Sequence, residues 1–567
     1  MAATSQVPAQ AERSRSGIAT LVLLGILALA TAVRLYSVGF GLPALNDPDE
    51  LTFELGAIKM LSGPTLNPGW FGHPATTTMY VLAVLTILVF GIGHLLGRFP
   101  TIDAFADALY TDPSWVLLPG RVAMVVFAVA TIYLTYRLTR ELFDRNTALV
   151  AAALLAINPV HVTWSQIIRS DMMACFFMLL GMLAALRILR EDRWRDHVLA
   201  ALWLGAAMAT KWPYALTALA VFGAVALRMA THPSDRLRSL VRLALFGVLG
   251  LVFLFAISPY LLLDHTTTAR NMRGEVQVHH LGATGGTLVE NAWWYLSGPL
   301  AAGLGPAGLA LSVGGLALVA RRREAAAVVL PVLLGFVIVL CVQSLVWERW
   351  VLSLMPLLAL AAAASLMALL RAVRHRWPRP VSGAVLALVA AAVLVPPTLR
   401  AQDDTRARLD DTRQRASRWA LAHIAPGSTV LIEHFAFDLL PQPWRFLFPF
   451  GEVGCIDARA TLSGKIQLSN VQSSRGARTN IDYGTVADER RETCRADYAI
   501  LTQGDRYIAE SRRFPAEAAT YRRLMASGTL VASFAPEPGK VGGPVVRVVR
   551  FAKGPAAAAS PPAKEAP

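Results

Sequence analysis

The chain has 567 residues, of which 55% are hydrophobic and only 16% are charged, and its mean hydropathy is +0.48. A soluble globular chain is roughly 25% charged, so this composition excludes an ordinary soluble protein and indicates an integral membrane protein. The net charge of +15 could suggest nucleic-acid binding, but the arginines stand in short clusters between apolar runs, which is typical of membrane topology. We therefore expect the bilayer, and no nucleic acid, as a partner.

Twelve apolar runs approach the ~20 residues that a helix needs to span a bilayer. The polar residues 1–16 are expected to form a disordered cytoplasmic N-terminus. The run 17–40 is too long for a signal-peptide core, so we expect it to remain as the first span. The runs cover residues 17–40, 74–97, 118–139, 147–164, 170–190, 197–210, 212–229, 239–261, 298–320, 325–346, 348–370 and 381–398.

Arginine clusters decide which of these runs cross the membrane. They stand at 137–145, 187–195, 228–242, 321–323 and 371–379. If all twelve runs crossed from a cytoplasmic N-terminus, these clusters would lie outside, against the positive-inside rule. We therefore predict that residues 73–97 form a helix or hairpin that enters from the outer side without crossing. Eleven crossings then place every cluster inside and the chain after residue 400 outside.

The composition becomes soluble from Ala401 onward. We predict a helix over 403–423 and strands at 429–433, 498–502, 530–534 and 545–551, which together indicate a small α/β domain. The expected organisation is a transmembrane domain (17–400), an extracytoplasmic α/β domain (401–553) and a disordered tail (554–567). Of four cysteines only Cys455 and Cys494 fall in the soluble part, and whether they form a disulfide stays open.

Three carboxylates follow the first span at the outer membrane face, in the run Asn46-Asp47-Pro48-Asp49-Glu50. Like charges this close raise one another's pKa or recruit a cation, which suits a general base or a metal ligand. A solvated loop is the alternative, with Asp49 as the N-cap of a helix over 51–61.

The next outer turn carries Arg169 and Asp171, and Asp171 opens the following apolar run, where it could also be a helix cap favoured by the dipole. Three further cations lie toward the outer side within apolar surroundings: Arg34, Lys211 and Arg349. A charge buried in a span costs ~2.5 to 3.5 kcal/mol, which favours a functional role, although snorkelling or pairing of Arg349 with Glu348 would also explain them.

The outer loop 262–297 is rich in polar groups, and His265 lies at the membrane surface beside Asp264. Carboxylates and cations thus converge on the outer face. Such a site suits an anionic and apolar substrate, such as a sugar attached through phosphate to a polyprenyl chain. Cations would bind the phosphate leaving group, and a carboxylate would deprotonate the acceptor hydroxyl. No glycine-rich nucleotide fingerprint is present, so a nucleotide-sugar donor is not expected.

At these residues the sequence resembles the GT-C superfamily of polyprenyl-phosphate-sugar glycosyltransferases, in the family 39-like branch of protein O-mannosyltransferases and lipid A aminoarabinose transferases. The resemblance covers residues 30–370. It rests on Asp49-Glu50 followed by 57–63, His73-Pro74, Arg121, Asn158-Pro159 through Arg169-Ser170-Asp171, Lys211, and Glu348-Arg349-Trp350 leading to Pro356.

The resemblance implies a GT-C fold of about eleven crossings with juxtamembrane helices in the first outer loop. It implies that Asp49 or Glu50 is the catalytic carboxylate, with Asp171 as a second important acid. Two departures affect the expected donor contacts: His73-Pro74-Ala75 lacks the family's second proline, and Glu348-Arg349-Trp350 replaces Glu-Arg-Tyr. Related enzymes differ in metal dependence, so a divalent metal held by His265 or Glu50 stays open.

The predicted function is transfer of a sugar, with inversion, from a polyprenyl-phosphate donor to a hydroxyl acceptor at the extracytoplasmic face of a bacterial inner membrane. The predicted catalytic residues are Asp49, Glu50 and Asp171, and the predicted substrate-binding residues are Arg34, His73, Arg169, Lys211, His265 and Arg349. The acceptor could be protein, lipid or glycan. The alternatives are a lipid or glycan transporter or flippase, which would usually show paired repeats with broken helices, and a scaffold of an envelope complex.

Overall fold

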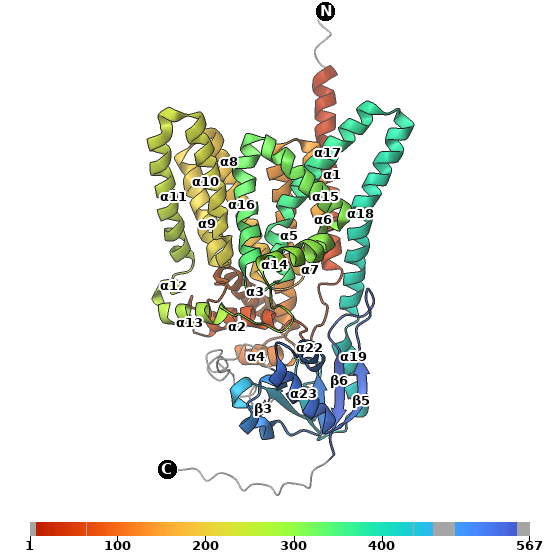
Figure 1. Cartoon of the computed structure of the whole chain (residues 1–567). Helices are drawn as coiled ribbons and strands as arrows, with labels where there is room; N and C mark the ends of the chain where they lie inside the picture. The colour runs from red at the N-terminus through yellow and green to blue at the C-terminus, as the bar shows by residue number, and fades with distance from the viewer. Residues whose placement is uncertain (1–6, 64, 435, 458–481, 553–567) are drawn as a thin grey trace, which may run out of the picture. The chain divides into compact units, whose positions relative to one another are not determined.

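The computed structural model describes residues 7–552 except 64, 435 and 458–481. Its contacts divide into two units (Figure 1). The first contains residues up to 40, 47–109 and 113–409. The second contains residues 41–46, 110–112 and the chain from 410 onward. The predicted disordered tail at 554–567 lies outside the described residues.

The first unit is helical. Its first helix begins at Val7, within the segment 1–16 that the sequence predicts to be a disordered N-terminus. The helices are α1 (Val7–Leu35), α2 (Asp49–Ser62), α3 (Thr76–Leu95), α4 (Ile102–Thr111), α5 (Ser114–Leu142), α6 (Arg145–Ala156), α7 (Pro159–Ser165), α8 (Ser170–Glu191), α9 (Trp194–Thr210), α10 (Ala218–Thr231), α11 (Arg236–Ile257), α12 (Tyr260–Leu263), α13 (His265–Glu275), α14 (Leu288–Tyr295), α15 (Ala301–Arg321), α16 (Arg323–Val342), α17 (Met355–Arg376) and α18 (Arg379–Leu409).

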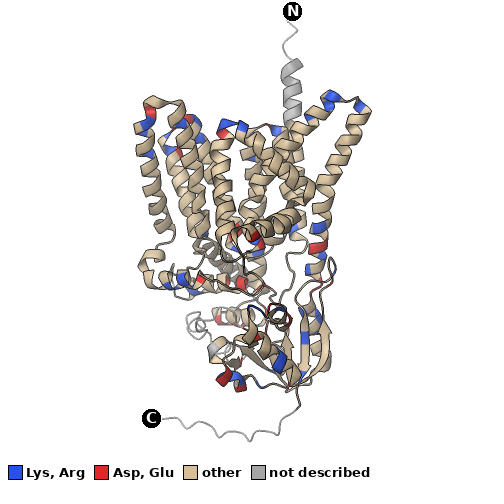
Figure 2. Ribbon diagram, viewed as in Figure 1, with Lys and Arg blue, Asp and Glu red and all other residues tan. Residues whose placement is uncertain are grey.

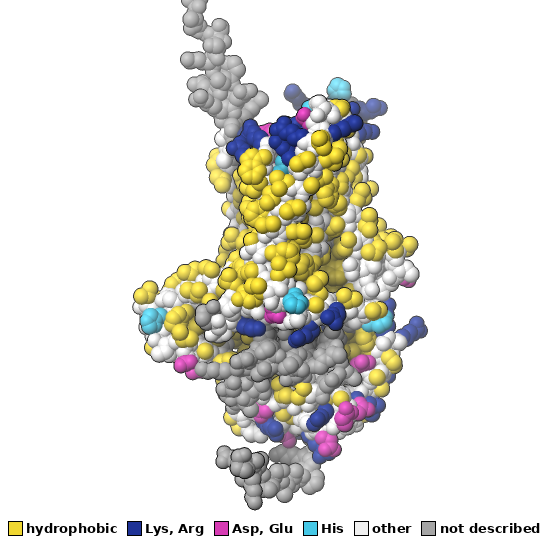
Figure 3. All heavy atoms as spheres, turned by 90° about the vertical axis from the view of Figure 1, so that its left-hand side faces the viewer, with side chains coloured by type: hydrophobic (Ala, Val, Ile, Leu, Met, Phe, Trp, Pro, Cys, Tyr) yellow, Lys and Arg dark blue, Asp and Glu magenta, His cyan; other side chains and the backbone are white. Residues whose placement is uncertain are grey.

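Among the described residues ten helices are long and apolar enough to cross a membrane, or eleven if α6 and α7, bent by 61°, form one span. This set includes α3 and leaves out α9, which has 17 residues. The predicted multi-pass helical membrane fold is confirmed. In the space-filling view an apolar surface covers the helices below a rim of Lys and Arg side chains (Figure 3), and the exposed Val241, Val248 and Val252 of α11 belong to such a surface.

One end of the helical unit collects the arginine clusters (Figure 2). Arg190, at the end of α8, pairs with Glu141 of α5 at 2.9 Å and with Glu324 of α16 at 2.7 Å. Arg371 of α17 pairs with Asp144, before α6, at 3.7 Å. Arg228 of α10 and Arg242 of α11 both pair with Asp192, at 3.4 and 2.7 Å. We call this the arginine end, and the opposite end the site end.

The helix α3 has both of its ends at the site end. Just before α3, the Ala75 amide donates to the carbonyl of Thr210, where α9 reaches the site end (3.1 Å). Just after α3, Arg98 lies 5.6 Å from the ring of Trp115 in the first turn of α5. That turn is at the site end too, because α5 runs from there to Glu141 at the arginine end. Within the helical unit, α3 therefore starts and ends on the same side, as the arginine clusters predict.

The second unit contains a six-stranded mixed sheet in the order β3-β2-β1-β4-β6-β5. The central strand β1 is parallel to β2 and β4, and the other pairs are antiparallel. The four predicted strands correspond to β1, β4, β5 and β6, whereas β2 and the three-residue β3 lie outside the predicted runs. The elements are α19 (Thr412–His423), β1 (Thr429–Ile432), β2 (Arg445–Pro449), β3 (Cys455–Asp457), β4 (Tyr498–Leu501), α22 (Gly504–Ala509), α23 (Pro515–Ala526), β5 (Thr529–Phe534) and β6 (Val546–Arg550).

The predicted helix over 403–423 is in fact two helices. The first, α18, continues to Leu409, and the chain passes into the second unit at Asp410. The Asp411 side chain accepts a hydrogen bond from the Arg413 amide (2.9 Å), so it caps α19 and ends the first helix.

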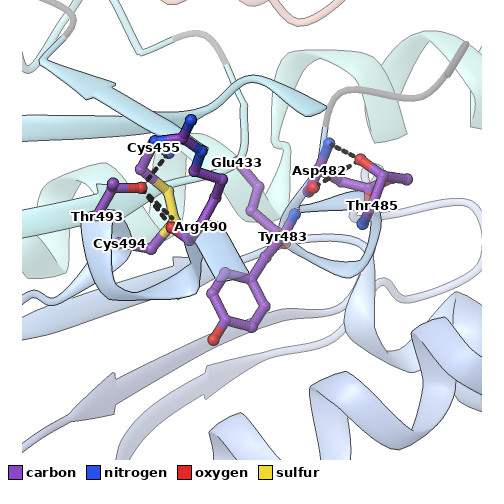
Figure 4. The surroundings of a disulfide bond; sticks show 8 residues. All are labelled: Glu433, Cys455, Asp482, Tyr483, Thr485, Arg490, Thr493 and Cys494. Carbon is purple, nitrogen blue, oxygen red and sulfur yellow. Dashed lines mark hydrogen bonds between the residues drawn. A yellow bond between two sulfur atoms is a disulfide. The ribbon is translucent and has the colours of Figure 1, made fainter. Parts of the chain in front are cut away.

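Cys455 and Cys494 form a disulfide that joins β3 to the short helix over Asp488–Cys494 (Figure 4). Beside it, Thr493 Oγ1 accepts from the Cys455 amide (2.7 Å) and donates to the carbonyl of Arg490 (2.6 Å). Glu433, which directly follows β1, accepts hydrogen bonds from the amides of Tyr483 (3.0 Å) and Thr502 (2.8 Å). The disulfide thus lies in a well-bonded part of the sheet domain.

Candidate active site

The carboxylates of the first outer loop are placed by the start of α2. The helix begins at Asp49 itself, and Asp47 Oδ1 accepts from the Asp49 amide (3.1 Å). The side chain of Asp47, rather than that of Asp49, therefore accepts from the first free amide of the helix. The Asp49 side chain is left available for other contacts. The Asp49 side chain is 52% exposed, whereas that of Asp47 is 16% exposed.

Arg169 brings the second outer loop to these acids. Its Nη1 donates to Asp49 Oδ2 at 2.5 Å, and its Nη2 donates to both oxygens of Asp47 at 2.9 and 3.0 Å. Arg169 occupies the N-cap position of α8. Partial burial works against ionisation of Asp49, but Arg169 and then Arg349 outweigh it and hold the pKa of Asp49 below its usual range.

Asp171 and Lys211 form a buried ion pair next to this cluster. Lys211 Nζ donates to Asp171 Oδ1 at 2.5 Å, and both residues are less than 10% exposed. Asp171 Oδ2 has no hydrogen-bond partner among the described residues. The pair joins the first turn of α8 to the end of α9, where Lys211 leaves the helix in an extended conformation. Removing either partner would leave a buried charge without compensation.

Arg349 is a buried cation that has no carboxylate partner among the described residues. Its guanidinium lies 4.3 Å from the ring of Trp347 and 5.9 Å from that of Trp164, which are cation–π contacts. Arg349 is 7% exposed, and its Nε makes no hydrogen bond within the described chain. Burial, followed by the nearby Arg169, lowers the pKa of Arg349 to about 10, so it remains charged at neutral pH. The alternative of a pairing with Glu348 is wrong for this structure.

His73 lies at the same site. Its ring contacts the rings of Trp70 (5.0 Å) and Phe53 (6.0 Å), and its Nε2 is 3.7 Å from Glu275 Oε2. Burial and then the charge of Lys211 lower the pKa of His73 to about 3. His73 is therefore a neutral polar group, able to donate or accept one hydrogen bond to a substrate without adding charge.

Glu50 has a different environment from Asp49. Its two oxygens accept from Arg121 Nε (2.8 Å) and Nη2 (2.6 Å), and Oε1 also accepts from the Ile168 amide (2.9 Å). Both side chains are 0% exposed. This bidentate ion pair locks the start of α2 to α5 and to the residue before Arg169.

Two predicted substrate-binding residues lie apart from this cluster. Arg34 is fully buried and donates to the carbonyls of Ala156 (2.9 Å) and Leu155 (3.4 Å) and to His161 Nδ1 (2.8 Å). It thus donates to carbonyls at the C-terminus of α6, which is a helix-capping role. His265 is exposed at the start of α13, and none of the contacts described above involves it.

Asp47, Trp164 and Trp347 belong to the site and were not among the predicted site residues. Asp47 belongs to the predicted carboxylate run, but spacing alone does not tell which acid faces a cation. The aromatic rings carry no sequence signal beyond their proximity to charged residues. Among the described residues no group of three or more His, Cys, Asp or Glu side chains could hold a metal ion. The acids of the site are instead matched by arginine and lysine.

The helical fold, with acids and cations gathered at one end, defines a class of polytopic membrane proteins with a charged site. Residues 104–262 match the model of the family "dolichyl-phosphate-mannose-protein mannosyltransferase". No curated protein matches the chain.

Among solved structures, ArnT from Cupriavidus metallidurans in the apo state is similar at 14% identity, with a TM-score of 0.51, over 94% of this chain and 98% of that one. The same protein bound to undecaprenyl phosphate is similar at 14% identity, with a TM-score of 0.51, over 93% of this chain and 97% of that one. An oligosaccharyltransferase from Archaeoglobus fulgidus shows 15% identity and a TM-score of 0.44, over 73% of this chain and 62% of that one. The chain therefore shares the fold of ArnT, and its residues 104–262 resemble the mannosyltransferase family. Neither supports the alternative of a transporter or flippase.

Proposed function

We propose that this protein is a glycosyltransferase that takes its sugar from a polyprenyl-phosphate donor and transfers it, with inversion, to a hydroxyl group of a protein, lipid or glycan acceptor. The observation that carries the proposal is Arg349, a buried cation without a carboxylate partner among the described residues, set beside the half-exposed Asp49. A cation of this kind suits a phosphate, because it loses no existing ion pair when the phosphate binds. The undecaprenyl phosphate bound to the ArnT neighbour supports a donor of the same class.

The proposed reaction is a single displacement. The acceptor oxygen attacks the anomeric carbon of the donor, the bond from that carbon to the phosphate oxygen breaks, and polyprenyl phosphate leaves. The acceptor proton passes to Asp49. One displacement inverts the anomeric configuration. Arg349, Lys211 and Arg169 stabilise the charge that grows on the leaving phosphate.

Arg169 has a second role in this proposal, because in the structure it donates a hydrogen bond to Asp49 Oδ2. A carboxylate whose charge is held by an arginine is a weak base. A donor phosphate that competes for Arg169 would release Asp49 to accept the proton. Asp171, with one oxygen lacking a partner among the described residues, would then orient Lys211 toward the phosphate. Glu50 and Arg34 would act through the structure around the site.

The proposed location is a bacterial inner membrane, with the site end and the second unit on the extracytoplasmic side. The arginine clusters at the opposite end support this orientation through the positive-inside rule. The Cys455–Cys494 disulfide also supports it, because disulfides persist in oxidising compartments.

The test uses purified protein, polyprenyl-phosphate sugars and a mixture of protein, lipid and glycan acceptors, with donor consumption as the measurement. Arg349→Met should raise the donor Kd about ten- to a hundredfold, because a charge-assisted contact is worth ~1.5 to 3 kcal/mol. Asp49→Asn should leave the donor Kd nearly unchanged and lower turnover about a hundredfold to ten-thousandfold.

Arg273→Met is the matched control, because Arg273 is an exposed arginine of α13, whose Nε donates to the backbone carbonyl of Ala269 (3.2 Å). It should bind and consume donor like the wild type. Wild-type kinetics in both Arg349→Met and Asp49→Asn would refute the proposed site, and wild-type protein that consumes none of the polyprenyl-phosphate sugars would refute the proposed donor class.

A further inference from the structure

Arg408, in the last turn of α18, contacts two segments that are far from it in sequence. Its Nη1 donates to the carbonyl of Thr163 (2.8 Å) and to Gln166 Oε1 (3.1 Å), in α7 and directly after it. Its guanidinium also lies 4.7 Å from the ring of Phe40, which follows α1. The proposed reaction gives Arg408 no part, although it is an arginine with specific contacts at the site end.

The ring of Phe40 carries a second guanidinium. Arg121 of α5 lies 4.3 Å from the same ring, and its Nη1 donates to the Phe40 carbonyl at 2.7 Å. Two cations on one ring repel each other, so the arrangement needs compensation from the ring face and from a nearby anion. Glu50, bound to Arg121, supplies that anion.

The contacts of Arg121 connect this ring to both loops of the site. In the first outer loop, Arg121 binds Glu50, the neighbour of Asp49 in the first turn of α2. In the second outer loop, the Ile168 amide donates to Glu50 Oε1, and Ile168 directly precedes Arg169.

Gln166 completes the link to the end of α1. Its Nε2 donates to the carbonyl of Arg34 (2.8 Å) and to Ser37 Oγ (2.9 Å). Arg408 therefore contacts Phe40 in the segment that leads into the first outer loop. It also contacts Gln166 in the segment that leads to Arg169 in the second outer loop.

We propose that Arg408 is a positioning residue of the transfer reaction: by fixing Phe40 and Gln166 it sets the loops that carry Asp49 and Arg169. Its guanidinium suits this role because a planar fork can stack on a ring and donate to two oxygens at once, which lysine cannot do equally well. The kinetic part of this inference rests on the proposed function, whereas the structural part does not.

The first variant is Arg408→Met, which keeps the apolar stem and removes the charge and the donors. We expect kcat to fall about ten- to a hundredfold, as small displacements of reacting groups do, with the donor KM changed less than about twofold. Arg406→Met is the matched control on the same helix, because its side chain is 59% exposed and pairs with Asp403 at 3.7 Å. It should behave like the wild type. A raised donor KM with unchanged kcat would make Arg408 a direct donor contact and would overturn the proposal.

A second measurement does not depend on the reaction. Hydrogen exchange followed by mass spectrometry should show faster exchange of peptides covering 36–40 and 163–169 in Arg408→Met, and no change in Arg406→Met. Faster exchange together with an inactive wild type would leave the positioning role standing and reject the proposed function. Unchanged exchange and kcat in Arg408→Met, with an active wild type, would reject the positioning role alone.

A double-mutant cycle separates positioning from general damage to the fold. Phe40→Leu should lower kcat in the same direction, and Phe40→Leu with Arg408→Met should lower it little further, because both changes break one contact. Additive effects would overturn the proposed coupling. If Arg408→Met does not fold, Arg408→Lys serves in its place, and a smaller loss of kcat is expected. Wild-type kcat in both Arg408→Lys and Phe40→Leu would overturn the positioning role of Arg408.

Discussion

Glu54 lies one helical turn after Glu50 in α2, and it is an acid buried to 1% exposure. Its Oε1 lies 2.9 Å from Thr86 Oγ1, while its Oε2 has no partner among the described residues. Thr86 also donates to the carbonyl of Leu82 (2.9 Å). Burial removes water from this carboxyl group, and the single hydrogen bond that Oε1 accepts from Thr86 does not offset the loss, so the protonated form is favoured. Burial raises the pKa of Glu54 from 4.5 to about 7.

We predict that Glu54→Gln changes how stability depends on pH. Between pH 4.5 and 7 the folded wild type keeps a proton that the unfolded chain has lost, so its stability falls as pH rises through this range and levels off above it. The full difference is on the order of 3 kcal/mol. Glu54→Gln should lack this slope in thermal unfolding in detergent from pH 4.5 to 8. Parallel curves for the two proteins would show that Glu54 is ionised throughout.

At the scale of the element, α3 is an apolar helix that passes every test of length and hydropathy for a span. Its contacts at both ends nevertheless belong to the site end of the helical unit. Hydropathy measures whether a segment can dissolve in lipid, and the path of the chain before and after it decides whether it crosses.

We predict that single cysteines at Asp107, after α3, and at Thr65, before it, are labelled by a membrane-impermeant thiol reagent from the same side. A cysteine at Arg374, at the arginine end, should be labelled only after permeabilisation. The measurement is the labelled fraction in sealed, right-side-out vesicles, against a variant without the two free cysteines Cys175 and Cys341. Labelling of positions 65 and 107 from opposite sides would make α3 a true span.

At the scale of the whole molecule, the two units differ in how they are stabilised. The helical unit exposes apolar side chains that a bilayer would cover, whereas the sheet domain has its own buried core, including Val430, Phe446, Ile500 and Val548. The Cys455–Cys494 disulfide adds a covalent link to that small core, closing a loop with a sequence separation of 39. In the chain-entropy model such a loop contributes about 4 kcal/mol by restricting the unfolded chain.

We predict that reduction lowers the unfolding temperature of the sheet domain, because the link is lost while the core stays the same. The measurement is a thermal melt with and without reductant. The double variant Cys455→Ser, Cys494→Ser should melt at the lower temperature and show no further shift with reductant. Four free thiols in unreduced, denatured protein would contradict the disulfide.

The sequence by itself determined the membrane class, the apolar runs, the side on which the arginines gather and the two outer loops that supply the acids. These follow from composition over stretches of about twenty residues, because that composition decides whether a segment partitions into lipid or into water. Only the tertiary structure decided which of Asp47, Asp49 and Glu50 remains exposed, and that the buried Arg349 faces aromatic rings with no carboxylate partner among the described residues. The ion pairs of the site join residues 40 to 122 positions apart over about 3 Å, and no local pattern records those distances.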